Sequence, residues 1–485
     1  MDRPEASAVS WVTVVIGTSF GVFLSALDSS VVNVSLVTME ASLGVNQDAI
    51  QWVIISYLLV LTSMMPLMGK LGDRYGKTRV FQAGMIVFVL GSLSDALSPT
   101  LPILVGSRLF QAIGASMMTA NGLAIVTYFT TPENRGRAIG YNSIVLALAL
   151  AVGPVVGGVL SEFYGWQSIF LVNVPIGIVG FIAVAKLIPH TQKVEETRFD
   201  TLGAVFFFTF LFVLVYVVSV AAVLDATLLV LLTAVTVVFF AAFYLQERSF
   251  ISPIIPTRIL SDRKVSVSVF SAILAYFGMI PVTYLLPFFL QDALGFSPMI
   301  TGLLLIPQPL TYAVIGPASG YISERVNAKI QTTAGLLVET FGLVFIAETI
   351  PSVPLIIVGM VIMGSGLSFF SVANGNFIMT SSPKEYMGVV SALINVSRTA
   401  GFSVSTAVAT AVFVFFLSAL NPSGALAGTA YLNAYVGAYK IAIYSVCAFV
   451  LLAAIISPFR GLNSVEESRN NNQSHEEIPP TMRNE

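Results

Sequence analysis

The sequence is poor in the residues from which metal sites and disulfide frameworks are built. Among 485 residues it has one cysteine, Cys447, and two histidines, His190 and His475. One cysteine cannot form a disulfide within the chain, and two distant histidines do not match a metal-ligand spacing. We therefore expect no metal and no cofactor. The sequence also lacks a nucleophile–base set and a phosphate-binding loop, which argues against an enzyme.

Charged residues are scarce as well. They make up 10% of the chain, whereas hydrophobic residues make up 56%; an average soluble domain has about 25% charged residues. The mean hydropathy of +0.88 excludes a soluble multidomain enzyme. The formal net charge is −2 and no basic face is interleaved with aromatics, so we expect no nucleic-acid partner. The composition indicates a polytopic membrane protein whose solvent is the lipid bilayer.

The apolar residues fall into fourteen stretches of the length that a membrane-spanning helix needs, about 20 residues. We read the first of them as a span and not as a signal peptide, because many more follow. The last residues, 460–485, are polar and predict a disordered tail. The predicted spans lie near residues 11–36, 50–69, 79–98, 102–126, 136–161, 167–188, 201–221, 226–245, 267–290, 298–322, 330–349, 353–379, 386–417 and 436–457.

Basic residues fall on one side of these spans. Twenty of the 23 lie in segments that share one face, and the loops of the opposite face have none. The other three are Arg108 and Arg398, which lie within spans, and Lys440, which lies near the outer end of the last span. By the positive-inside rule the base-rich face is cytoplasmic. We therefore expect both termini in the cytoplasm and the protein in the plasma membrane.

The chain is built twice. Asp73-Arg74 matches Glu324-Arg325 at an offset of 251 residues, and Ala120-Asn121-Gly122 matches Ala373-Asn374-Gly375 at an offset of 253. The matches pair spans 2 to 5 with spans 10 to 13, so each half has six helices. We expect an all-α fold with the transport path between the two repeats. The predicted domains are residues 1–190, a linker of two additional helices at 191–262, residues 263–459, and the tail 460–485.

The stretch from Gly69 to Arg79 is the most distinctive motif. It holds several glycines, one acid and four bases between two apolar stretches, so we expect a loop in water at the membrane face. An ordinary cytoplasmic loop would also be basic, but Gly320–Arg325 repeats its core. Asp73 is placed to meet the positive end of the next helix dipole. The residues predicted to form this gating loop are Gly69, Gly72, Asp73, Arg74, Gly76, Lys77 and Arg79.

Of the charged residues inside predicted spans, three are candidates for coupling protons to substrate: Asp28, Arg108 and Glu339. An ionised Asp at mid-bilayer costs roughly 2.5–3.5 kcal/mol, so Asp28 should face water, be protonated or pair with a base. Arg108 could approach it. Each has an alternative role as a hydrogen-bonded packing residue, and for Glu339 the two roles are equally well supported.

Polar and aromatic residues on the expected cavity helices predict a broad, adaptable pocket, although such side chains often only pack helices. They are Asn33, Tyr57, Gln111, Asn142, Tyr276, Tyr284, Gln308, Asn374 and Asn395. In span 5 small residues predict close helix packing that seals the path, and Pro154 predicts a kink. That motif consists of Gly140, Gly153, Pro154, Gly157 and Gly158.

These motifs carry a family resemblance. The chain resembles the fourteen-span drug:proton antiporter branch of the major facilitator superfamily from Ser10 to Phe459. Gly69–Arg79, Leu27–Leu36, Arg108–Gly114 and Gly140–Gly158 resemble the superfamily and exporter motifs, and Tyr164–Gly177 resembles the fourteen-span branch in particular.

The resemblance implies a proton-coupled antiporter that exports lipophilic compounds, cations among the candidates, by rocking of its two halves. Its implied partners are a small-molecule substrate and protons, and we expect a monomer. Two alternatives stay open. The chain could carry one specific metabolite, or it could be a transport-inactive membrane sensor.

Overall fold

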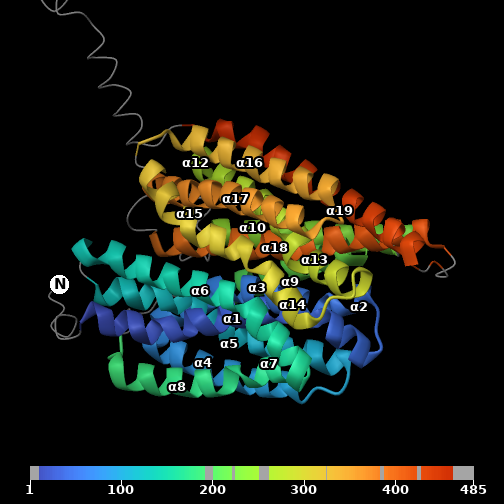
Figure 1. Cartoon of the computed structure of the whole chain (residues 1–485). Helices are drawn as coiled ribbons and strands as arrows, with labels where there is room; N and C mark the ends of the chain where they lie inside the picture. Colours follow the sequence, from blue (N-terminus) through green and yellow to red (C-terminus); the bar gives the residue numbers. More distant parts are fainter. Residues whose placement is uncertain are drawn as a thin grey trace, which may run out of the picture.

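The computed structural model describes residues 10–130, 132–191, 200–220, 224–250, 261–323, 325–382, 387–422, 426 and 428–461. Almost all of the predicted tail, and Glu324 of the repeated motif, lie outside these residues. In the described part the chain is helical throughout. Figure 1 shows the blue-to-green half of the chain on one side and the yellow-to-red half on the other.

The first half forms six spans. They are α1 (Trp11–Leu43), α2 (Gln47–Ile50) with α3 (Trp52–Tyr75), α4 (Lys77–Ala96), α5 (Leu101–Phe129), α6 (Pro132–Tyr164), and α7 (Ser168–Leu171) with α8 (Asn173–Leu187). The α1 helix packs on α5, α6 and α8, while α4 packs on α5. This places α1 and α5 side by side in the interior of the half.

The second half repeats this arrangement. Its six spans are α12 (Arg263–Ala275) continued by η1 (Tyr276–Met279), η2 (Pro281–Leu285), α13 (Leu286–Phe288) and η3 (Phe289–Ala293); α14 (Pro298–Leu305) with α15 (Pro307–Ser323); α16 (Ala328–Thr349); α17 (Val353–Ser381); α18 (Met387–Leu420); and α19 (Gly428–Ile456) with η5 (Ser457–Arg460).

The packing shows the repeat directly. A Cβ at Gly114 in α5 would stand 2.4 Å from the backbone nitrogen of Phe88 in α4, and one at Gly366 in α17 would stand 2.2 Å from that of Glu339 in α16. Phe88 and Glu339 are 251 positions apart and Gly114 and Gly366 are 252 apart, close to the offsets of 251 and 253 between the sequence motifs. Close backbone approach at a glycine is therefore used at the same place in both halves.

Two helices join the halves, α9 (Thr201–Val220) and α10 (Ala226–Ser249). The α9 helix packs against both α3 and α18, where Leu211 joins Ile55 and Ala407. Trp52 and Tyr216 add a ring contact across α3 and α9. The added pair thus covers the seam between an N-half and a C-half helix. That residues 206–216 stay out of the central path remains a prediction.

The number of spans is confirmed for the described residues. Thirteen helices are long and apolar enough to cross a membrane, and α9, with the shorter apolar stretch Thr201–Leu214, is the fourteenth. The all-α fold with fourteen spans is therefore as predicted.

The predicted loop at Gly69–Arg79 is wrong in its secondary structure. Helix α3 runs on to Tyr75 and α4 begins at Lys77, so only Gly76 lies outside a helix. Its φ of 98° is the backbone conformation that glycine adopts without strain. Hydropathy marks where the apolar stretch ends, whereas these helices continue past that point.

The ninth span is broken along its length. It changes from α-helix to a 3₁₀ turn at Tyr276–Met279, then to π-helical turns at Pro281–Leu285 and Phe289–Ala293. Prolines in a helix remove hydrogen bonds, and non-α turns often mark hinges. This span lies in the C half against α18 and α19.

Candidate functional site

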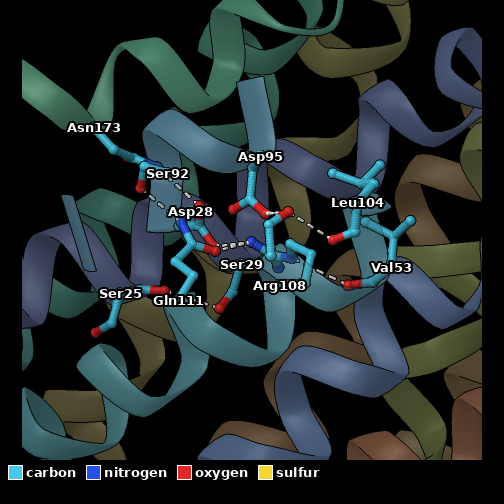
Figure 2. A network of polar contacts seen from close by, with 11 residues as sticks. Ser25, Asp28, Ser29, Val53, Ser92, Asp95, Leu104, Arg108, Gln111 and Asn173 are labelled. Carbon is cyan, nitrogen blue, oxygen red and sulfur yellow. Dashed lines mark hydrogen bonds and ion pairs between the residues drawn. The ribbon is translucent and has the colours of Figure 1, made fainter. Parts of the chain in front are cut away.

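Asp28 and Arg108 form a buried ion pair in the N half. Nη1 of Arg108 donates to Oδ2 of Asp28 at 2.7 Å, and the two side chains are 0% and 1% exposed respectively. Asp28 comes from α1 and Arg108 from α5, the two helices that pack together in the interior (Figure 2). The structure thus brings together two of the three predicted coupling residues. The charge of Arg108 compensates the burial of the Asp28 carboxylate.

Two amides complete the surroundings of Asp28. Its Oδ1 accepts from Nε2 of Gln111 at 3.0 Å and from Nδ2 of Asn173 at 2.8 Å. Gln111 was predicted as a cavity residue and also accepts from Nη1 of Arg108, while its Nε2 donates to Ser92 at 2.7 Å. Both carboxylate oxygens of Asp28 therefore accept hydrogen bonds, so neither is left unsatisfied in the interior.

Arg108 is held from several sides. Its Nε donates to the carbonyl oxygen of Val53 at 3.1 Å, and its guanidinium lies 4.2 Å from the ring centre of Tyr57 and 5.5 Å from that of Phe170. Planar stacking of this kind suits Arg and not Lys. Its Nη2 has no hydrogen-bond partner among the described residues. Nε and Nη1 therefore anchor the guanidinium, and Nη2 is left as a spare donor group among the described residues.

Asp95 is a further acid of this site and lies at the end of α4. It is 0% exposed, and Oδ1 accepts from the hydroxyl of Ser107 at 2.5 Å, while Oδ2 has no partner in the described part of the chain. Figure 2 shows it beside Arg108. Ser92 and Asp95 stand three residues apart, so they share one face of α4. This polar pair within an apolar stretch was the one sign in the sequence that this face of α4 belongs to a polar site.

Asn173 was also missed as a site residue, although it lies within the stretch Tyr164–Gly177 that resembles the fourteen-span branch. It is the first residue of α8 and 0% exposed. Its Nδ2 reaches Asp28 across 145 positions of sequence. A lone Asn at a helix start gives no sign of such a distant partner.

Glu339 lies apart from this network, in the C half. It is 0% exposed between α16 and α17, and neither carboxyl oxygen has a hydrogen-bond partner among the described residues. A Cβ at Gly278 would stand 2.2 Å from its Oε1. An ionised carboxylate without donors would be very costly at this position.

The other cavity candidates of the N half differ in their roles. Tyr57 stacks on Arg108. Asn142 in α6 accepts from the hydroxyl of Ser19 in α1 at 3.2 Å, and so links two helices of the same half. Asn33 is half-buried in α1.

The candidates of the C half lie at several separate places. Tyr284 donates to the carbonyl oxygen of Gln47 across the halves at 3.5 Å. Asn374 donates to the carbonyl oxygen of Ser268 and accepts from Arg460 at 2.8 Å, so its amide holds helix ends together. The remaining three are Gln308, which is buried, Tyr276, which packs edge-on against Phe402, and Asn395, which accepts from Arg398.

The small residues of α6 serve two contacts. Cβ atoms at Gly153 and Gly157 would stand within 2.6 Å of Ser30 and Val31 of α1, in the same half. Two other members of the motif face the other half. A Cβ at Gly158 would stand 2.3 Å from the carbonyl oxygen of Pro298 in α14, and a Cβ at Gly302 of α14 would stand 2.1 Å from the carbonyl oxygen of Pro154. The surroundings of Gly140 lie outside the described residues.

Hydrogen bonds join the two halves at the base-poor face. Across this seam Nε2 of Gln291 donates to the carbonyl oxygen of Val34 at 3.0 Å. The backbone nitrogen of Met299 donates to Oε2 of Glu162 at 2.9 Å. Together with the Gly158 contact, these bonds join the two halves on that side.

At the base-rich face the gating motif is held by local contacts. Asp73 lies in the last turn of α3 and pairs with Lys77, the first residue of α4. That its carboxylate meets the dipole of α4 stays a prediction. A Cβ at Gly72 would stand 1.8 Å from Oδ1 of Asn121 in α5, which explains a glycine there. Of the other motif residues, Gly69 faces α5, Arg74 lies over the ring of Tyr75, and Arg79 is exposed.

Comparisons with known proteins agree with this architecture. The chain matches the description Major Facilitator Superfamily over residues 18–406. It is 32% identical over 448 residues to the riboflavin transporter RibZ of Clostridioides difficile (strain 630), covering 92% of this chain and 97% of the relative. It is 30% identical to the multidrug resistance protein Stp of Mycobacterium tuberculosis (strain CDC 1551 / Oshkosh), covering 83% and 76%.

Solved structures show the same fold. A bacterial homolog of the human lysosomal transporter Spinster, in an inward-facing and unoccupied conformation, has a TM-score of 0.66 at 16% identity. It covers 95% of this chain and 98% of that chain. The family match spans most of the sequence, and the RibZ alignment spans nearly all of it. The chain therefore belongs to the Major Facilitator Superfamily, and it is a multi-pass membrane transporter of small molecules and not an enzyme.

Proposed function

We propose that the chain is a proton-coupled antiporter that exports lipophilic compounds, cations among them, across the plasma membrane. The observation that carries this proposal is the buried pair of Asp28 and Arg108 with its amide donors. Ionisable residues in a membrane interior are expensive and mark proton or substrate paths. A packing role would be met at lower cost by apolar residues of similar volume.

The chemistry of coupling follows from one carboxylate with two uses. Ionised Asp28 can face a base or a cationic substrate, whereas protonated Asp28 has no charge to offer either. A proton that arrives on Asp28 therefore weakens its hold on a cation and frees Arg108. The membrane potential supplies about 2.3 kcal/mol for each charge moved through 100 mV.

The proposal places the halves, residues 1–190 and 263–459, as bodies that rock about the path between them. The base-rich face is cytoplasmic by the positive-inside rule, with both termini there. We place the closed, outer side at the base-poor face, supported by the hydrogen bonds that join the halves there. The gating motif at Gly69–Arg79 then belongs to the side that opens.

The test is transport by purified protein in liposomes with an acidic interior. We expect uptake of ethidium that collapses when the proton gradient is abolished, and no such uptake with Asp28→Asn, which mimics the permanently protonated form. Binding of a neutral compound should survive the substitution. If the variant accumulates ethidium at the parent rate, Asp28 is a packing residue and Glu339 becomes the leading coupling candidate.

A transporter of one defined metabolite is the second candidate. It is favoured by the similarity to RibZ, a relative named for riboflavin, over nearly the full length of both chains. The same liposomes separate the two functions, because a metabolite transporter moves riboflavin or a related compound and leaves ethidium untouched. Absence of any transport would support the membrane sensor instead.

A further inference from the structure

A polar cavity lies away from the Asp28 network, at the base-poor face. Its volume is about 240 Å³. The N half contributes residues at the end of α1 and in α2, and the C half contributes η3, α18 and α19. We call this cavity the outer vestibule. Because both halves build it, any rocking motion changes its shape.

The vestibule is acidic. Three of its lining residues are carboxylates, Glu40, Asp48 and Asp292, and none of its described lining residues is basic. The loop that follows α18, residues 421–427, contains no Lys or Arg either. Glu40 and Asp292 are close enough for their charges to act on each other. Like charges that share one cavity favour a bound cation.

Aromatic rings form the other wall. Tyr431 and Tyr435 line the vestibule, with ring centres 5.9 Å apart, and Phe413 lies 4.9 Å behind Tyr435. Tyr435 is 2% exposed, and its hydroxyl oxygen finds no hydrogen-bond partner in the described structure. A buried hydroxyl of this kind at a cavity wall is available to water or another polar group inside the cavity.

The combination selects the class of ligand. The described residues contain no group of three or more Asp, Glu, His or Cys side chains that could hold a metal ion. The three carboxylates therefore do not converge on one point as metal ligands would. Val414 and Leu417 add apolar lining between the acids and the rings. Negative charge, aromatic faces and apolar surface are how proteins recognise quaternary ammonium groups.

We propose that the outer vestibule binds organic cations of the quaternary ammonium type as a second site, separate from Asp28. The proposal rests on the export function above, in which the vestibule is the last station before release. Asp28 lies in the interior of α1, whereas Glu40 lies in its last turn, so the two sites are distinct. A substrate would pass from one carboxylate to the other along the same helix.

The experiment measures binding of radiolabelled tetraethylammonium to the full-length protein in detergent. In the Asp28→Asn background, we expect one saturable site to remain. Adding Glu40→Gln and Asp292→Asn should weaken it by about tenfold or more, as expected for loss of charge beside the rings. Glu348→Gln is the matched control. That residue lies at the end of α16, paired with Lys440 and Tyr444 outside the vestibule, and its loss should leave binding unchanged.

The outcomes are distinguishable. Unfolding midpoints confirm that the near-isosteric variants are folded. Loss of all tetraethylammonium binding with Asp28→Asn alone, or undiminished binding without Glu40 and Asp292, overturns the vestibule site. Ethidium export by the parent protein is measured in parallel. If export is absent while vestibule binding persists, the export function fails and the binding site stands.

Discussion

Gly278 and Glu339 are packed directly on each other, so that a Cβ at position 278 would stand 2.2 Å from Oε1 of the carboxyl. Gly278 lies in the 3₁₀ turn that breaks the ninth span. A Leu or Met at position 339 would fill the same space without the cost of a buried carboxyl. The pair therefore places a buried acid directly against the break in the ninth span.

The first prediction concerns that acid. Glu339→Gln should leave the unfolding midpoint unchanged, because a neutral carboxyl and an amide have similar size and polarity. We expect the number of protons exchanged per substrate to fall, since the amide cannot release a proton when the broken span rearranges. Proton flux and substrate flux measured in the same liposomes give this ratio. An unchanged ratio would assign Glu339 to packing.

The second prediction concerns the ion pair in the N half. Arg108→Ala should destabilise the protein by about 3–5 kcal/mol, because it leaves the buried Asp28 carboxylate without its base. The double variant with Asp28→Asn should recover most of that loss. Denaturation in detergent measures both. Arg398→Ala is the control, since Arg398 is only half-buried and donates to the neighbouring Asn395; equal losses at both arginines would contradict the assignment.

The third prediction concerns the closed base-poor face. Gly158→Ala should weaken it, because the added Cβ would stand 2.3 Å from the carbonyl oxygen of Pro298 in the other half. Alkylation of Gln291→Cys, with Cys447→Ser to remove the native thiol, should then become faster.

Gly375→Ala is the matched control, because nothing lies within 4 Å of a Cβ at that position. If both alanine variants change the alkylation rate alike, the Gly158 contact does not hold the face shut.

The fourth prediction concerns Asp73. We expect it to dock across the halves near Met387 and Gly388 when the base-rich face closes. The side chains there lie outside the described residues, and in this structure Asp73 pairs with Lys77. Asp73→Asn should slow turnover and raise cytoplasmic accessibility while the protein still folds. Turnover and labelling rates equal to those of the parent would rule the latch out.

The sequence alone predicted the membrane setting, the fourteen spans and the repeat. These follow from local hydropathy and from motif spacing, which need no knowledge of contacts. It also singled out Asp28 and Arg108, because a charge within an apolar stretch is conspicuous wherever the helix finally packs. The same reasoning could not say whether Glu339 would join them; the structure places it in the other half, against Gly278.

Tertiary structure decided which residues share a site. Asn173 and Asp95 approach the ion pair only because α4, α5 and α8 pack around α1, and no pattern along the chain encodes that meeting. It also decided that Gly69–Tyr75 continues a helix and that Gly158 touches the opposite half while Gly157 does not. Hydropathy can be read from each segment by itself. The partners of a buried polar group depend on how the segments pack, because each buried donor and acceptor needs a partner within hydrogen-bond distance.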